Sequence, residues 1–282
     1  MNIDQDYKNY FSFLDNYIEK AYSTAKKARM LNKDPEPHID IPVAKDLAAR
    51  VEGLVSIIHP NLMNSGLAKG IRILEKQYSK NDERVALKIS EQTANNNFYK
   101  FETKQDSVDA GVRVGVAYLT LGVVTAPLEG IESIKLVNDQ IHLYYAGPIR
   151  SAGGTAAAMS VMIADYLRIR LGLKEYKPTP DQIKRYGVEL EDYSRMVGMQ
   201  YDPKREETEF IIKHIKVCLT GSPTEKFEVS NFKDIDGVET PRVRGGMCLV
   251  VGEGLTLKAP KLTKRIKKFG KEFGLDQSWS WL

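Results

Sequence analysis

Hydrophobic and polar positions in the first third of the chain repeat with the period of α-helices. Residues 6–31 contain no glycine or proline, and apolar side chains recur there at steps of three and four residues, as at Tyr7, Tyr10, Phe11 and Leu14. This spacing predicts one long amphipathic helix with an aromatic stripe along one face. Two roles remain open for the stripe, which either packs on its own domain or docks against another subunit or another part of a larger assembly.

The next elements are also helical. Asp34-Pro35-Glu36-Pro37 is expected to end the first helix, because proline cannot continue a helix and restricts the residue before it. Apolar positions at the helical period then predict three helices, at residues 43–57, 66–79 and 82–95. Residues 95–97 and 100–106 are polar and are expected to form a loop. The chain up to about Leu121 is therefore predicted to be mainly α-helical.

The second half mixes strands and helices. Residues 131–137 and 140–145 flank Asn138-Asp139, which predicts a β-hairpin with a two-residue turn. A third strand is expected at residues 215–219, with 227–229 pairing to it. Helices are expected at 155–171, from Pro180 to about Val197 with Thr179 as the N-cap, and at 203–212. These elements predict a sheet with helices on one face.

The predicted fold class is α+β, with a mainly helical N-terminal part followed by a mixed sheet-and-helix domain. We expect a helical arm at residues 1–33, a mainly helical domain at 34–128, and an α+β domain at 129–282 that contains a glycine-rich loop and a basic C-terminal run. A chain of 282 residues with 42% hydrophobic content can bury one large core or two smaller ones.

The sequence also bears on where in the cell the protein is expected. No stretch approaches the roughly 20 apolar residues of a membrane span, and the N-terminus lacks the features of a signal peptide. We therefore expect a soluble, cytoplasmic protein that does not contact a membrane. Cys218 and Cys248 form no Cys-x-x-Cys pair, and the four histidines form no metal-binding pair. The cysteines are predicted to be reduced core residues, and no metal site is predicted.

A glycine-rich junction follows the hairpin. The apolar run ending at Tyr145 gives way to Gly147-Pro148-Ile149-Arg150-Ser151-Ala152-Gly153-Gly154-Thr155, after which the sequence is strongly helical. A helix start of this kind points free N–H groups and the positive end of the helix dipole at one place. Arg150, Ser151, Gly153, Gly154 and Thr155 are therefore phosphate-binding candidates. The alternative is a helix of small residues packed tightly on a sheet, and the spacing matches neither common nucleotide-binding glycine pattern.

Two basic segments are further candidates. Arg242 and Arg244 stand two apart, so in extended chain both would point to the same side and could reach one phosphate-bearing surface. The alternative is that both arginines bridge to acidic neighbours within the fold.

Although the net charge is only +4, residues 258–271 carry basic side chains and no acidic one. A polyanion such as a nucleic-acid backbone fits this run, and a solvated helix face is the alternative. The basic residues of the run are Lys258, Lys261, Lys264, Arg265, Lys267, Lys268 and Lys271.

A catalytic centre is not predicted in this chain. Asp234, Asp236 and Glu239 could hold magnesium in principle, but alternate carboxylates in a turn-like run are more often loop solvation. Ser151 and Ser222 have no adjacent histidine and do not lie in a Gly-x-Ser-x-Gly motif. The sequence thus favours binding over catalysis within these residues.

Three blocks of sequence resemble one known family. They are Tyr144–Arg168 (YYAGPIRSAGGTAAAMSVMIADYLR), Pro241–Met247 followed by Glu253-Gly254 and Lys258-Ala259-Pro260-Lys261, and the closing Trp279-Ser280-Trp281-Leu282. All three are similar to the large subunit of archaeal DNA polymerase D, and the similarity runs in order from about Tyr7 to the last residue. The chain resembles the N-terminal segment of that subunit.

The resemblance implies a function for a longer protein. The family enzyme adds deoxynucleotides to a primer, using magnesium in a core of two double-psi β-barrels with an Asn-Ala-Asp-Phe-Asp-Gly-Asp type motif. That motif is absent from this chain, so the segment alone is expected to be inactive. The implied partners are a small subunit with 3′ to 5′ exonuclease activity in a heterodimer, primer-template DNA, and the rest of the large subunit.

Three roles for the segment follow from these observations. The first is a DNA-binding scaffold, and the second is a partner-docking module, acting through Tyr10 and Phe11 without DNA contact. The third is an independent phosphate-transfer site at residues 147–155.

Overall fold

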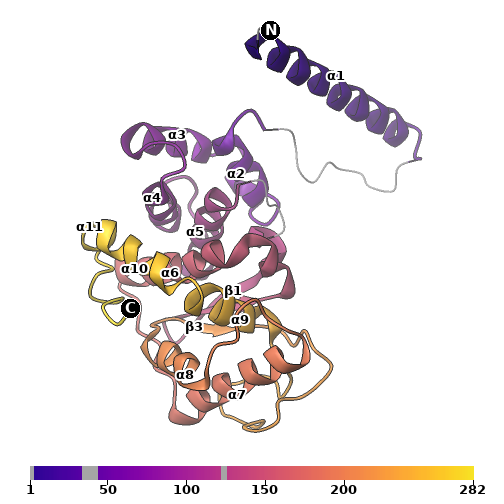
Figure 1. The fold of residues 1–282 in the computed structure, drawn as a ribbon. Coiled ribbons are helices and arrows are strands. Elements are labelled where there is room, and N and C mark those ends of the chain that lie inside the picture. Colours follow the sequence, from indigo (N-terminus) through magenta and orange to yellow (C-terminus); the bar gives the residue numbers. More distant parts are fainter. Residues whose placement is uncertain (1–2, 34–43, 122–125) are drawn as a thin grey trace. The chain divides into compact units, whose positions relative to one another are not determined.

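The computed structural model describes residues 3–33, 44–121 and 126–282. The chain forms two compact units, Met1–Pro42 and Val43–Leu282 (Figure 1). The first unit consists of one long helix, α1 (Ile3–Met30), which confirms the helix predicted at residues 6–31. The predicted stop at Asp34-Pro35-Glu36-Pro37 lies outside the described residues.

The second unit begins with four helices, of which the helical period predicted the first three; the fourth, α5, lies in chain that was predicted to be mainly α-helical but without a separate helix. Helices α3 and α4 agree closely with the predicted ranges, whereas α2 is shorter than predicted. Helix α5 starts where a polar loop was expected to run on to Asp106. That part of the prediction is wrong because Thr103 caps the helix, its hydroxyl accepting a hydrogen bond from the Asp106 N–H at 3.1 Å. The helices are α2 (Leu47–Val55), α3 (Leu67–Tyr78), α4 (Glu83–Ala94) and α5 (Lys104–Leu119), with a 3-10 turn at Pro60–Leu62.

The sheet of the described residues has three strands in the order β1-β2-β3. Strands β1 (Ile131–Val137) and β2 (Gln140–Tyr145) form the predicted hairpin, and a short π-helical turn at Ala126–Gly130 precedes it. Asn138 and Asp139 both have positive φ, of 53° and 65°, as a tight hairpin turn requires. The hairpin prediction is confirmed.

Strand β3 (Cys218–Thr220) pairs in parallel with β2, and the predicted pairing of residues 227–229 with it is wrong. Just after the strand, Gly221 lies against the backbone of Tyr145, where an added Cβ would lie 2.1 Å from the carbonyl oxygen. Residues 227–229 instead pair with the chain around Arg242, and the Val229 N–H donates to the Pro241 carbonyl at 3.0 Å.

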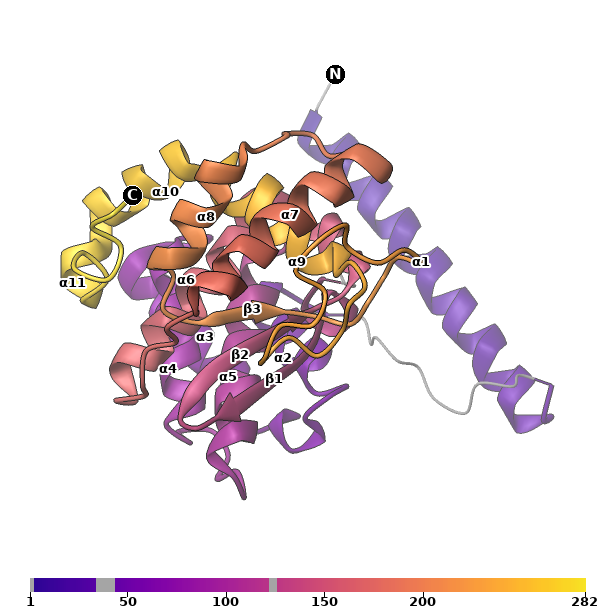
Figure 2. The same ribbon diagram turned by 90° about the horizontal axis from the view of Figure 1, so that it is seen from below.

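Helices cover both faces of the sheet, which corrects the expectation of helices on one face (Figure 2). On one face the Tyr145 hydroxyl lies 2.7 Å from Ser160 of α6 (Gly153–Arg170). On the other, the hydroxyl of Tyr186 on α7 (Pro180–Met196) donates to the Leu219 carbonyl of β3. Strand β3 is buried throughout, so both of its faces need a covering layer.

The remaining helices complete the second unit. Thr179 and Gln182 form a reciprocal capping box at the start of α7, which confirms Thr179 as the N-cap and Pro180 as the first helical residue. The 3-10 turn η3 (Gly147–Ala152) precedes α6, and α8 (Arg205–His214) follows α7. A nearly continuous helical stretch follows, made of α9 (Gly245–Leu249), η4 (Val250–Thr256), α10 (Ala259–Arg265), η5 (Ile266–Gly270) and α11 (Lys271–Phe273), and residues 274–282 form turns after it.

One hydrophobic core runs through the whole second unit, from Ala48 to Trp279. Residues of the predicted helical domain and of the predicted α+β domain both belong to it, so the structure has no division near residue 128. The fold class is α+β, with a helical part first and a small mixed sheet after it.

Candidate nucleic-acid interface

The glycine-rich junction is a packed contact between α6 and η4. Gly153 has a φ of 72°, and a Cβ added to Gly154 would lie 2.1 Å from the carbonyl oxygen of Glu253. A side chain at Gly154 is therefore excluded by backbone. This geometry is a tight packing of small residues, as in the alternative to an anion cradle, although the contact is with η4 and not with the sheet as that alternative had it.

The polar side chains of the junction are held by the protein itself. Arg150 is about half exposed, and its Nη2 lies 3.5 Å from Glu253 Oε1 and 3.4 Å from the Gly198 carbonyl. The Ser151 hydroxyl donates to the Pro148 carbonyl at 2.8 Å, and Thr155 is half-buried. The loop presents one arginine to solvent beside a carboxylate, and a phosphate contact there stays a prediction.

Arg242 and Arg244 do not share a surface. Arg242 is exposed, whereas Arg244 is 1% exposed, and its Nη2 lies 2.7 Å from Glu189 Oε2. The predicted phosphate contact is therefore wrong for Arg244, because the buried carboxylate of Glu189 requires a counterion. Gly245 and Gly246, which follow, allow close backbone approach as expected, since a Cβ on Gly246 would lie 2.7 Å from Ala146.

A second arginine completes this buried cluster. Arg185 Nε lies 3.1 Å from Glu189, and its two terminal nitrogens donate to the carbonyls of Phe232, Lys233, Thr240 and Arg242 at 2.9–3.1 Å. Burial acts to raise the pKa of Glu189, but Arg244 and Arg185 hold it below its ordinary value. The cluster holds the loop at residues 230–243 in place near both of its ends, because Arg185 bonds to the carbonyls of Phe232 and Arg242. The only sequence signal for it was the i,i+4 spacing of Arg185 and Glu189 on a helix.

The basic run at residues 258–271 forms an amphipathic helical stretch. Its inner face buries Leu262, Phe269 and Phe273. Its outer face exposes lysines at three- and four-residue steps, so they lie along one side of the stretch. We call these residues the lysine stripe: Lys261, Lys264, Lys267, Lys268 and Lys271.

The other two basic residues of the run lie apart from the stripe. Arg265 is mostly buried and its Nε lies 2.6 Å from Glu83 Oε1, so its charge is already paired. Lys258 is half-buried, and its Cε lies 3.0 Å from the position of a Cβ on Gly154.

Acidic residues near the stripe are largely occupied by other partners. Arg84 pairs with Asp82 at 2.9 Å, Tyr78 donates to Glu272 at 3.1 Å, and Glu83 holds Arg265. Lys268 comes within 3.9 Å of Asp82 yet remains well exposed. The stripe therefore presents positive charge to solvent, of which only that of Lys268 has an ion-pair partner among the described residues.

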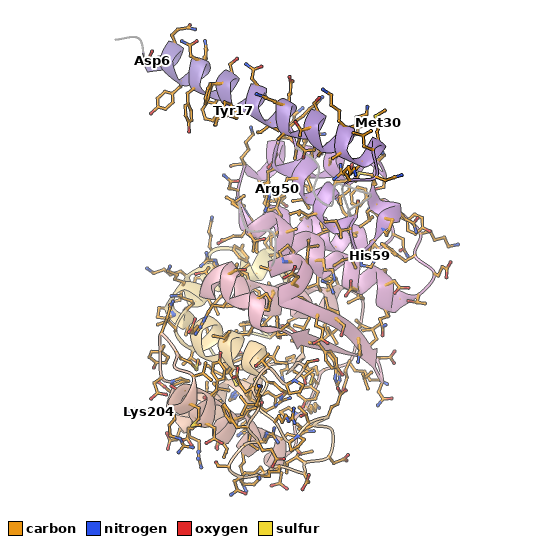
Figure 3. All side chains as sticks on the ribbon, turned by 90° about the vertical axis from the view of Figure 1, so that its right-hand side faces the viewer. Asp6, Tyr17, Met30, Arg50, His59 and Lys204 are labelled. Carbon is orange, nitrogen blue, oxygen red and sulfur yellow. The ribbon has the colours of Figure 1, made fainter. Side chains whose placement is uncertain are left out.

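Helix α1 carries the second predicted surface, an aromatic one. Tyr7, Tyr10, Phe11 and Tyr17 are each more than half exposed, while Leu14 is half-buried; Tyr17 is labelled in Figure 3. Sequence reasoning missed Phe13, whose ring centroid lies 4.8 Å from that of Tyr17. Docking through this face is not tested by the structure of the chain alone.

The structure also bears on the predictions about cysteines, metal ligands and membrane-spanning segments. Cys218 and Cys248 are buried and unpaired, which confirms them as reduced core residues, and burial raises the pKa of the Cys218 thiol to about 11. In the described part of the chain, no cluster of three or more His, Cys, Asp or Glu residues could hold a metal ion. None of the helices described is long and apolar enough to cross a membrane.

Comparison with known proteins identifies the family. The family model described as "DNA polymerase II large subunit DP2, N-terminal" matches residues 9–282. The chain therefore belongs to this family, the N-terminal region of the large subunit of archaeal family D polymerases, and the resemblance noted in the sequence is confirmed.

Individual relatives agree. The DNA polymerase II large subunit of Nanoarchaeum equitans is 44% identical over 279 residues, covering 97% of this chain and 22% of that protein. The corresponding protein of Methanosarcina barkeri is 43% identical over 278 residues, covering 97% of this chain and 23% of the relative. That of Natronomonas pharaonis is 43% identical over 284 residues, covering 99% and 23%. The chain thus spans less than a quarter of the length of these relatives.

Proposed function

We propose that this chain is a DNA-contacting scaffold segment of the large subunit of a replicative DNA polymerase. The lysine stripe is the observation that carries this proposal. It offers five exposed ammonium groups on one side of a helical stretch whose other side is anchored in the core. Such an array suits a sequence-independent contact with a nucleic-acid backbone.

The dimensions of the stripe fit this role. Residues three or four apart advance about 5 Å along a helix, so the stripe, from residue 261 to 271, covers about 15 Å. Each strand of duplex DNA carries one phosphate per about 3.4 Å of helix axis. Several phosphates could therefore lie within reach of the flexible lysine side chains, and Arg242 and Arg150 are further exposed candidates elsewhere on the same unit.

The proposed whole protein follows from its relatives. They are named as DNA polymerase large subunits, and we extend to this protein a template-directed polymerase activity that needs magnesium at a site outside the present residues. We also propose a heterodimer with a small subunit that carries the 3′ to 5′ exonuclease. Primer-template DNA and the rest of the large subunit complete the proposed partners.

The salt dependence of DNA binding tests the stripe. We would change Lys264, Lys267, Lys268 and Lys271 together to Gln and measure the affinity for primer-template DNA over a range of salt concentrations. Each lost phosphate contact should lower the slope of log affinity against log salt by about 0.7 to 0.9, with little change in sequence preference. Stability should change little, because exposed lysines contribute little to it.

A matched control removes the same charge elsewhere. Lys100, Lys177, Lys213 and Lys226 are exposed and make no hydrogen bond or ion pair among the described residues. Their combined replacement by Gln should leave the salt slope closer to wild type. Equal slopes and affinities for the stripe variant and wild type would show that the stripe does not contact DNA and is only a solvated helix face.

A second candidate is a partner-docking module without DNA contact. The exposed aromatic side chains of α1 favour it, since large apolar groups in solvent gain free energy when a partner covers them. The two candidates use different residues, so both can be tested in one protein.

A further inference from the structure

A cavity lies between α8, the start of α10 and the C-terminal residues, which Figures 1 and 2 show side by side. Its volume is about 440 Å³, within the range of about 300 to 1,000 Å³ that is usual for ligand pockets. None of the lysine stripe lines it. Its apolar walls come from Phe210, Ile211, Leu255, Trp281 and Leu282.

A row of neighbouring aromatic rings forms and supports one wall of the cavity. The ring centroids of Phe210 and His214 are 4.3 Å apart, and those of His214 and Trp281 are 5.8 Å apart with nearly parallel planes. Trp279 stacks behind Trp281 at 5.5 Å, and its indole N–H donates to the buried carboxylate of Asp165 at 2.8 Å. The wall is therefore anchored to the core, while Phe210 remains about half exposed.

The cavity also has acidic lining residues, which lie on α8 one helical turn before the apolar residues that this helix contributes. Glu206 is exposed and makes no hydrogen bond or ion pair within the described residues. Its neighbour Arg205 is engaged by Glu191 at 3.0 Å, so that cation is already paired. Glu207 accepts a hydrogen bond from Tyr201 at 3.1 Å. Since neither lysine nor arginine lines the cavity, its rim is negative in a protein of net charge +4.

We propose that this cavity docks a peptide segment in which an aliphatic or aromatic side chain stands next to Lys or Arg. The apolar group would fill the space beside Phe210 and Trp281, and the cation would lie against Glu206. Aromatic anchors in pockets and cations over aromatic faces are common sources of affinity in such contacts. The two carboxylates disfavour a phosphate backbone. The site is independent of the proposed DNA contact.

Tryptophan fluorescence reports the site directly, because Trp279 and Trp281 are the only tryptophans of the chain. The probes are acetyl-Leu-Phe-Arg-Arg-amide and acetyl-Leu-Phe-Glu-Glu-amide, which share one apolar part and differ in charge. The cationic peptide should change the emission saturably and the anionic peptide should not. No saturable change with the cationic peptide up to about 1 mM, a weak affinity by any standard, would overturn the proposal, as would equal responses to both.

Variants locate the binding. Glu206→Gln should weaken the cationic peptide about fivefold, the worth of one exposed charge pair, and Phe210→Ala about tenfold. The matched controls Glu102→Gln and Ile73→Ala, at exposed positions away from the cavity, should bind like wild type. Unchanged binding by both cavity variants would overturn the proposal.

A nucleic-acid ligand gives a different pattern. If a short oligothymidylate changes the emission and Phe210→Ala abolishes that change, while the cationic peptide has no effect, the cavity receives a nucleobase and the peptide proposal fails. Circular dichroism of each variant shows that the fold is retained.

Discussion

Arg242 and Arg244 lie two residues apart, and the structure gives them opposite roles. Arg242 is in solvent, while Arg244 is enclosed with Glu189 and donates from Nη1 to the Thr220 hydroxyl at 3.0 Å. A sequence pattern places both side chains on one side of an extended strand. It does not reveal that this side faces a buried carboxylate of α7, because that contact joins residues 55 positions apart.

The buried pair predicts a sharp difference between the two arginines. Replacing Arg244 with Gln leaves Glu189 short of a counterion in the core and should lower the free energy of unfolding by about 3 kcal/mol or more. Arg242→Gln, the matched control, should change it by less than about 0.5 kcal/mol. Denaturant unfolding of both variants measures this. Equal stabilities would mean that Arg185 alone compensates Glu189.

At the scale of elements, the predictions that succeeded rest on local signals. Asn138-Asp139 specifies its own tight turn, and Thr179, Pro180 and Gln182 specify the start of α7 through a capping box. The partner of β3 could not be predicted in the same way. Its pairing with β2 joins residues 76 positions apart, and the close approach of Gly221 to Tyr145 just after the strand is visible only in three dimensions.

The candidate interface was likewise predicted where the signal is local and missed where it depends on distant residues. The helical period and the local absence of acidic residues predicted the lysine stripe. They did not predict that Arg265 is bound by Glu83 of α4, 182 positions away. The glycine-rich junction was predicted as strand, loop and helix start. The close packing of Gly154 on η4, a distant part of the chain, could not be predicted from the sequence, and a phosphate contact at the loop stays a prediction.

Gly154 offers a test of packing at this junction. A Cβ there would meet the carbonyl oxygen of Glu253, so Gly154→Ala should destabilise the protein by about 1 to 3 kcal/mol, the usual cost of overpacking, with no DNA present. Gly147→Ala is the matched control, because its Cβ meets nothing within 4 Å and its φ is not positive. Thermal unfolding of the two variants measures this difference in stability. A Gly154→Ala protein as stable as wild type would mean that the backbone at the junction shifts to accommodate a Cβ, and would contradict the tight packing.

At the scale of the whole molecule, the chain consists of two units, one that contains helix α1 and one with its own hydrophobic core. The buried residues of the core begin at Ala48 and none belongs to α1. The stability of the second unit should therefore not depend on α1, whereas assembly with a partner could depend on it.

Deletion of residues 2–32 tests this separation. The shortened chain should keep a cooperative thermal transition near that of the intact chain, since no core residue is removed. Pull-down of the small subunit by the large subunit, with and without residues 2–32, should show a loss of assembly if α1 docks the partner. Outright unfolding of the shortened chain would place α1 in the core. Undiminished assembly would remove the docking role.

The last prediction concerns the catalytic activity of the purified chain. Two-metal phosphoryl transfer needs carboxylates clustered around a pair of metal ions, and the described residues contain no group of three or more metal-ligating side chains. The acidic motif implied by the family is also absent from the sequence. We therefore expect the purified chain to give no primer extension with magnesium and all four deoxynucleotides, while a full-length relative extends the same primer under the same conditions. Extension that persists in the purified chain and is abolished by removing magnesium would show that a polymerase site lies within these 282 residues after all.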